Sequence, residues 1–178
     1  MQNLLTVIKK EIFPIGLILI LALARLIPHP PNFTPVIAVA ILSGYFFKNV
    51  NLSLLTLLVA MLISDLFIGF YENVIFVYAS LLLITFAFHK INKKINFKNL
   101  FIYGFAGSLI FFIVSNFGVW ALGSPGVLDV AYERNLSGLV ECYILAIPFF
   151  GNTFLSTLIF AYPTIFFYKS LASGTSSR

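Results

Sequence analysis

The chain has 178 residues, of which 60% are hydrophobic, 17% aromatic and only 10% charged, and its mean hydropathy is +1.02. No water-soluble domain of this size tolerates such a composition, so the sequence predicts one integral membrane domain. The formal net charge of +5 does not indicate nucleic-acid binding, because the basic residues stand singly or in short clusters between apolar runs.

Continuous apolar runs predict helices rather than a β-barrel, whose strands alternate over roughly 10 residues. We expect an all-α membrane protein with six transmembrane helices, at residues 12–27, 33–47, 52–70, 74–88, 100–122 and 149–168. Pro148 and Gly151 are expected to separate the last span from an additional helical piece at 137–147. These segments form a single transmembrane domain, residues 1–169, followed by a tail, residues 170–178, that is expected to be disordered.

The basic residues predict the orientation of the six spans. An amino terminus inside the cell leaves only Arg25 and Arg134 outside, and it places nine basic residues in the cytoplasm: Lys9, Lys10, Lys48, Lys90, Lys93, Lys94, Lys98, Lys169 and Arg178. Cytoplasmic loops carry an excess of Lys and Arg. Both termini are therefore expected to be cytoplasmic.

The segment from Arg25 to Pro35 is a polar interruption between the first two spans, and four of its residues are prolines. Each proline fixes its own φ and disfavours helix in the residue before it, so we expect a stiff, extended loop. Arg25, His29 and Asn32 give this loop a cation, a titratable imidazole and an amide, which favours a binding role. The alternative is an ordinary proline turn whose arginine extends to the lipid headgroups.

Polar residues on four separate segments fall at a similar depth, in the outer half of the predicted bundle: Arg25, Asp65, Asn116 and Glu141. With His29 and Asn32 above them, these residues predict a solute cavity open to the outside. Because an isolated charge in lipid is costly, Arg25 is expected to pair with Asp65 or Glu141. The alternative is that these polar groups only lock the helices together.

Several aromatic residues and the cysteine are predicted to have structural roles. Tyr71, Trp120, Tyr132 and Tyr143 lie near the predicted outer boundary and are interpreted as interfacial belt residues. Cys142, the single cysteine, is interpreted as an inert core thiol. We find no motif of a metal site, a nucleophile elbow or a phosphate loop, so we expect neither an enzyme nor a bound cofactor.

Three features of the first 70 residues carry a resemblance to a known family: the arginine- and proline-marked end of the first span, the short second span with Ile41-Leu-Ser-Gly44, and Ile63-Ser-Asp65-Leu-Phe-Ile-Gly69. Together they resemble the S-components, the substrate-binding subunits of energy-coupling factor transporters. The segments 28–35, 115–120 and 142–150 also resemble a group of uncharacterised small bacterial membrane proteins.

The resemblance to S-components implies a six-span bundle in the bacterial inner membrane that works with a coupling subunit and ATPases. The expected function is therefore the capture of a vitamin-like or other small polar solute from the outer face, as a subunit or as a solitary transporter. Two other functions stay open: a scaffold subunit of a membrane assembly, and a membrane enzyme of unrecognised type.

Overall fold

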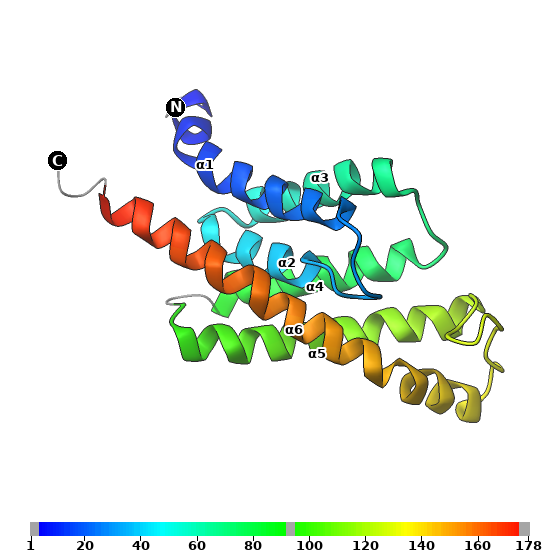
Figure 1. Cartoon of the computed structure of the whole chain (residues 1–178). Helices are drawn as coiled ribbons and strands as arrows, with labels where there is room; N and C mark the ends of the chain where they lie inside the picture. The colour runs from blue at the N-terminus through cyan, green and yellow to red at the C-terminus, as the bar shows by residue number, and fades with distance from the viewer. Residues whose placement is uncertain (1–3, 92–94, 175–178) are drawn as a thin grey trace.

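The computed structural model describes residues 4–91 and 95–174. This part of the chain is all-helical. Its elements are α1 (Leu4–Leu23), a 3-10 turn η1 (Ala24–Leu26), α2 (Val36–Phe46), α3 (Val50–Ile68), α4 (Val74–Ile91), α5 (Phe97–Leu122) and α6 (Leu136–Gly174) (Figure 1).

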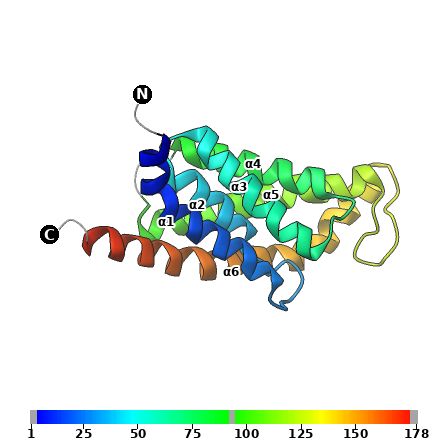
Figure 2. The ribbon, with the colours of Figure 1, turned by 90° about the horizontal axis from the view of Figure 1, so that it is seen from above.

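The six helices form an up-and-down bundle in which successive helices run in opposite directions. Helix α1 begins and α6 ends at the same end of the bundle, called here the terminal end (Figures 1 and 2). The connection between α3 and α4 and the longer connection between α5 and α6 lie at the opposite end, called here the loop end. Successive helices of the described part thus begin at alternate ends of the bundle.

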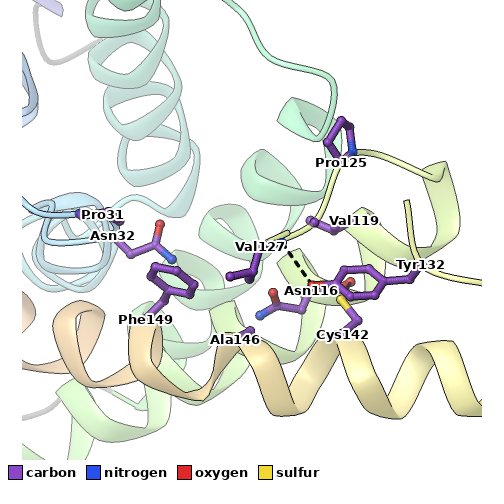
Figure 3. Close-up of a pocket in the computed structure, with 11 residues that line it drawn as sticks. Pro31, Asn32, Asn116, Val119, Pro125, Val127, Tyr132, Cys142, Ala146 and Phe149 are labelled. Atoms are coloured by element: carbon purple, nitrogen blue, oxygen red, sulfur yellow. Dashed lines mark hydrogen bonds between the residues drawn. The ribbon is translucent and has the colours of Figure 1, made fainter. Parts of the chain in front are cut away.

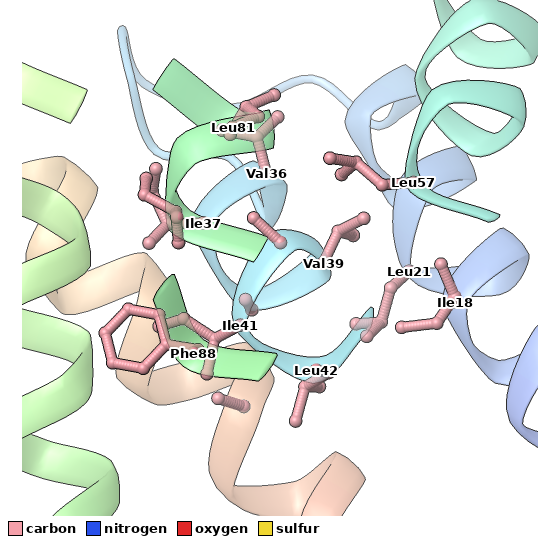
Figure 4. Close-up of a cluster of buried hydrophobic side chains, with 14 of the residues drawn as sticks. Ile18, Leu21, Val36, Ile37, Val39, Ile41, Leu42, Leu57, Leu81 and Phe88 are labelled. Carbon is pink, nitrogen blue, oxygen red and sulfur yellow. The ribbon is translucent and has the colours of Figure 1, made fainter. Parts of the chain in front are cut away.

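Helix α2 is the centre of the bundle. It has only 11 residues, of which all but Tyr45 are buried, and it packs against each of the other five helices. Figure 4 shows its side chains, among them Ile37, Val39 and Ile41, surrounded by apolar side chains of the neighbouring helices. At about 1.5 Å per residue α2 rises only about 16 Å, roughly half of a hydrocarbon core, and protein encloses it throughout.

Among the described residues, four helices are long and apolar enough to cross a membrane: α3, α4, α5 and α6. Their faces away from α2 carry exposed large hydrophobic side chains, for example Leu66, Ile75 and Phe105, which suits a helix whose outer face meets lipid. The all-helical fold and the membrane character expected from the sequence are therefore present.

The predicted break in the last apolar stretch is wrong. Helix α6 continues for 39 residues through Pro148 and Pro163, because membrane helices accommodate proline by local adjustment and by bonds from neighbouring groups. Helix α6 also extends to Gly174, across the first five residues of the predicted disordered tail; residues 175–178 lie outside the described part. Helix α1 starts at Leu4, eight residues before the predicted span, and contains Pro14 in its interior.

Candidate functional site

The proline loop, residues 27–35, contains a tight turn rather than one extended crossing. The amide of Phe33 donates to the carbonyl of Pro30 at 3.0 Å, and Asn32 has a positive φ of 59°. Proline and asparagine are favoured at the two central positions of a type II turn, where the second residue needs positive φ. Pro31 and Asn32 occupy those positions, so the local sequence explains the turn.

Three side chains of α6 hold this loop against the bundle. Asn152 Nδ2 donates to the Pro31 carbonyl at 3.0 Å, and Ser156 Oγ donates to the Thr34 carbonyl at 2.9 Å. Thr153 Oγ1 lies 3.5 Å from the Asn32 carbonyl. A loop rich in prolines has few amides with which to bond itself, so these donors satisfy carbonyls that would otherwise lack partners.

Arg25 and Asp65 form a buried ion pair. Arg25 Nη1 lies 2.6 Å from Asp65 Oδ1, and Asp65 is fully buried. Arg25 Nη1 also donates to Ser64 Oγ at 2.6 Å, and Tyr78 Oη donates to the second carboxylate oxygen at 2.7 Å. The expected pairing of Arg25 with an acid is confirmed, and of the two candidates, Asp65 and Glu141, Asp65 is the partner.

The position of this pair follows from helix electrostatics. Helices α1 and α3 run in the same direction, Arg25 lies in the 3-10 turn that ends the first, and Asp65 lies in the last turn of the second. Helix C-termini carry partial negative charge, which disfavours a carboxylate and favours a cation. Arg25 therefore compensates Asp65 and both helix ends. Tyr71, in the α3–α4 connection, lies beside these charges, and burial raises its pKa to about 12.

A pocket of about 280 Å³ lies at the loop end, between the proline loop, α5, the α5–α6 connection and α6. Figure 3 shows Asn32 and Phe149 on one side of it and Asn116, Tyr132 and Cys142 on the other. The remaining lining residues are Pro31, Val119, Pro125, Gly126, Val127 and Ala146.

The α5–α6 connection closes one wall of this pocket. It folds into a small hairpin in which Gly126 N donates to the Val130 carbonyl at 3.0 Å. Tyr132 Oη accepts the Val127 amide at 3.1 Å, which holds the tip of the hairpin over the pocket. Trp120 Nε1 donates to the Glu133 carbonyl at 3.0 Å and ties the base of the hairpin to α5.

The structure separates the six predicted site residues into different places. Asn32 and Asn116 line the pocket. Arg25 and Asp65 bind each other inside the bundle and do not line it. His29 is exposed on the proline loop, with Nδ1 3.0 Å from the Pro30 carbonyl, and Glu141 is exposed on α6. The polar cluster expected at one depth is thus a buried ion pair and a distinct, uncharged pocket.

Sequence reasoning missed two sets of residues. Tyr132, interpreted as an interfacial residue, and Cys142, interpreted as a core thiol, are buried but line the pocket. The α6 donors to the proline loop were also missed. Asn152, Thr153 and Ser156 form a polar group inside an apolar stretch, and spacings of three and four residues on one helix face are a signal of interhelical bonding.

Comparison with known proteins places the chain in a family but does not supply an activity. No curated protein and no solved structure matches the chain. One family model matches residues 6–175, which is nearly the whole chain. That match agrees with the resemblance to uncharacterised proteins seen in the sequence. The chain belongs to this family, which is described as a family of unknown function (DUF6580).

Proposed function

We propose that the protein binds a small solute in the pocket at the loop end and serves as a substrate-capture subunit or a solitary small transporter. The observation that carries the proposal is the pocket itself: polar groups of Asn32, Asn116 and Tyr132 converge on a mostly apolar cavity. A concave, largely apolar site with a few polar groups is the usual form of a small-molecule site.

The support around the pocket also favours a binding role. The proline loop is stiff and is fixed to α6 by Asn152 and Ser156, while the hairpin is fixed to α5 by Trp120. A wall that is already ordered loses little conformational entropy when it engages a ligand. A helix bundle that served only as a scaffold would not require such a supported cavity.

The distribution of basic residues supports an outward-facing pocket. Arg25 and Arg134 belong to the loop end. Within the described part of the chain, six of the basic residues expected in the cytoplasm belong to elements or connections at the terminal end: Lys9, Lys10, Lys48, Lys90, Lys98 and Lys169. Under the positive-inside rule the loop end faces the outside of a bacterial inner membrane, with six spans and cytoplasmic termini. The resemblance to S-components extends the proposal to a partner: a coupling subunit with ATPases that would drive uptake.

The single cysteine gives a direct test of solute binding. Cys142 lines the pocket, so methyl methanethiosulfonate, a small neutral thiol reagent, should modify it in the purified protein, and a bound solute should slow that modification. We expect at least one compound in a library of small metabolites to protect Cys142 and to change the fluorescence of Trp120, the only tryptophan.

A matched control is the Glu141→Cys variant in a Cys142→Ala background. Position 141 is one residue away on the same helix but is exposed and does not line the pocket. The same solute should leave its modification rate unchanged. A Cys142 that never reacts, or a library in which no compound protects it, would contradict the proposed function and leave the scaffold as the better explanation.

A further inference from the structure

The pocket has no charged lining. None of its lining residues is Asp, Glu, Lys, Arg or His, and Arg25 and Asp65 of the predicted site are already paired with each other at 2.6 Å. A charged solute that entered would lose water without gaining an opposite charge, and that loss is costly in a low-dielectric site. The lining therefore favours an uncharged ligand.

The hydrogen bonds inside the wall determine which polar groups remain for a ligand. Asn116 Nδ2 donates to the Phe112 carbonyl at 2.8 Å, which leaves its Oδ1 as an acceptor without a donor in the described part of the chain. Tyr132 Oη accepts from Val127 N, which leaves its hydroxyl proton free to be donated. Both groups lie on the same side of the pocket (Figure 3).

A free acceptor beside a free donor is the complement of an amide. A carboxamide or lactam carries an N–H donor and a carbonyl acceptor on one planar group, whereas a carboxylate only accepts and an ammonium group only donates. The Asn32 side chain lies on the opposite side of the pocket and makes no hydrogen bond with another described residue. Its amide therefore offers the ligand a further donor and a further acceptor.

The walls limit the size of the ligand. The volume of about 280 Å³ lies below the roughly 300–1,000 Å³ of sites for drug-sized molecules. Phe149, Val119 and Val127 supply apolar surface next to the polar groups. A body about as large as one aromatic ring satisfies both the volume and the apolar wall.

We propose that the ligand is an uncharged molecule of single-ring size that carries a carboxamide or lactam group, and that Asn116 and Tyr132 read this group. The inference rests on the proposed function and specifies its substrate class. Selectivity follows from the same two residues: the corresponding carboxylate leaves Asn116 Oδ1 facing an acceptor, and the corresponding amine leaves the Tyr132 hydroxyl without an acceptor.

Three probes of nearly equal shape test this inference: benzamide, benzoate and benzylamine, compared at neutral pH with the full-length protein in detergent. Binding is measured by ligand-observed NMR, and occupancy of the pocket by protection of Cys142. We expect the dissociation constant of benzamide to be lower than that of benzoate or benzylamine by at least about tenfold, the size of one well-placed hydrogen bond in a pocket.

Variants of Asn116 test whether this residue causes the preference for benzamide. Asn116→Leu should remove the preference for benzamide, and Asn116→Asp, which places a carboxylate in the pocket, should shift the preference toward benzylamine. Glu141→Gln, on the exposed face of α6, is the control and should change none of the three affinities.

The outcomes separate the substrate class from the function. If benzoate or benzylamine binds as tightly as benzamide, or if only unrelated library compounds protect Cys142, the class is wrong although the pocket is a solute site. If neither the probes nor the library protects Cys142, both the class and the proposed function are wrong. A benzamide preference that persists in Asn116→Leu would also overturn the inference, because another group would then be selecting the amide.

Discussion

Arg25 and Asp65 show how a single pair of residues can fix the register of an apolar bundle. Apolar side chains of similar size can exchange contacts between neighbouring helices at small cost. A buried ion pair cannot, because each charge needs its partner at one position. The pair joins the end of α1 to the last turn of α3, and Tyr78 extends the connection to α4. Three helices are thereby aligned at one level.

Removing one member of this pair should strongly destabilise the protein. Arg25→Gln and Asp65→Asn should each lower the free energy of unfolding by about 3–5 kcal/mol, because the remaining charge stays buried without compensation. The double variant should lose less than the sum of the two single losses, since no uncompensated charge is left. Denaturant unfolding in detergent measures these differences.

The matched control is His29→Ala, an exposed residue on the neighbouring loop, for which a change within about 0.5 kcal/mol is expected. Single variants of Arg25 and Asp65 that both keep the stability of the wild type would show that the two residues are hydrated rather than buried as a pair.

At the scale of elements, the short helix α2 depends on close approach to α4. Thr85 Oγ1 donates to the Ala40 carbonyl at 3.0 Å, across the two helices. One turn further along α2, a Cβ added to Gly44 would lie 2.6 Å from the backbone oxygen of Thr85. Ala40 and Gly44, four residues apart on α2, therefore lie at a close helix contact of the kind that small residues permit in membranes.

Gly44→Ala should separate these two helices. The added methyl group meets backbone rather than a flexible side chain, so the helices must move apart, and overpacking of this kind costs about 1–3 kcal/mol. Gly16→Ala is the control, because a Cβ at Gly16 meets nothing within 4 Å and alanine favours the helix by roughly 0.5–1 kcal/mol. Thermal unfolding of both variants should give opposite shifts; shifts of the same sign and size would contradict the close contact at Gly44.

The helices could be predicted from the sequence more completely than the site could. Apolar runs identified all six helices of the described part of the chain, and the cost of an unpaired charge limited the expected partner of Arg25 to Asp65 or Glu141. Residue counting gives the depth of a side chain in a bundle, but it does not give the face on which that side chain lies. Glu141 and Cys142 are adjacent in sequence and equal in depth, yet only Cys142 lies on the pocket face, with Ala146 and Phe149.

Other parts of the site depended on contacts that no local pattern contains. Tyr132 enters the pocket because the α5–α6 connection folds back as a hairpin, and its position is set by a bond to Val127. The predicted break at Pro148 failed for a related reason: the propensity of proline to end a helix is a local preference, and packing of α6 along α5 and α2 overrides it.

At the scale of the whole molecule, the proposed function requires the loop end and the terminal end to lie on opposite sides of one membrane. Two reporter cysteines in a Cys142→Ala background test this requirement: Leu128→Cys at the tip of the hairpin and Lys98→Cys at the start of α5, both at exposed positions. A membrane-impermeant maleimide added to intact cells should modify position 128 but not position 98, and permeabilised cells should show modification of both. This result is expected because Lys98 is one of nine basic residues predicted on the cytoplasmic side, whereas only Arg25 and Arg134 are predicted on the side of position 128. Modification of position 98 alone in intact cells would turn the pocket toward the cytoplasm, and modification of both would mean that the bundle does not separate its two ends; either result removes the basis for solute capture from outside.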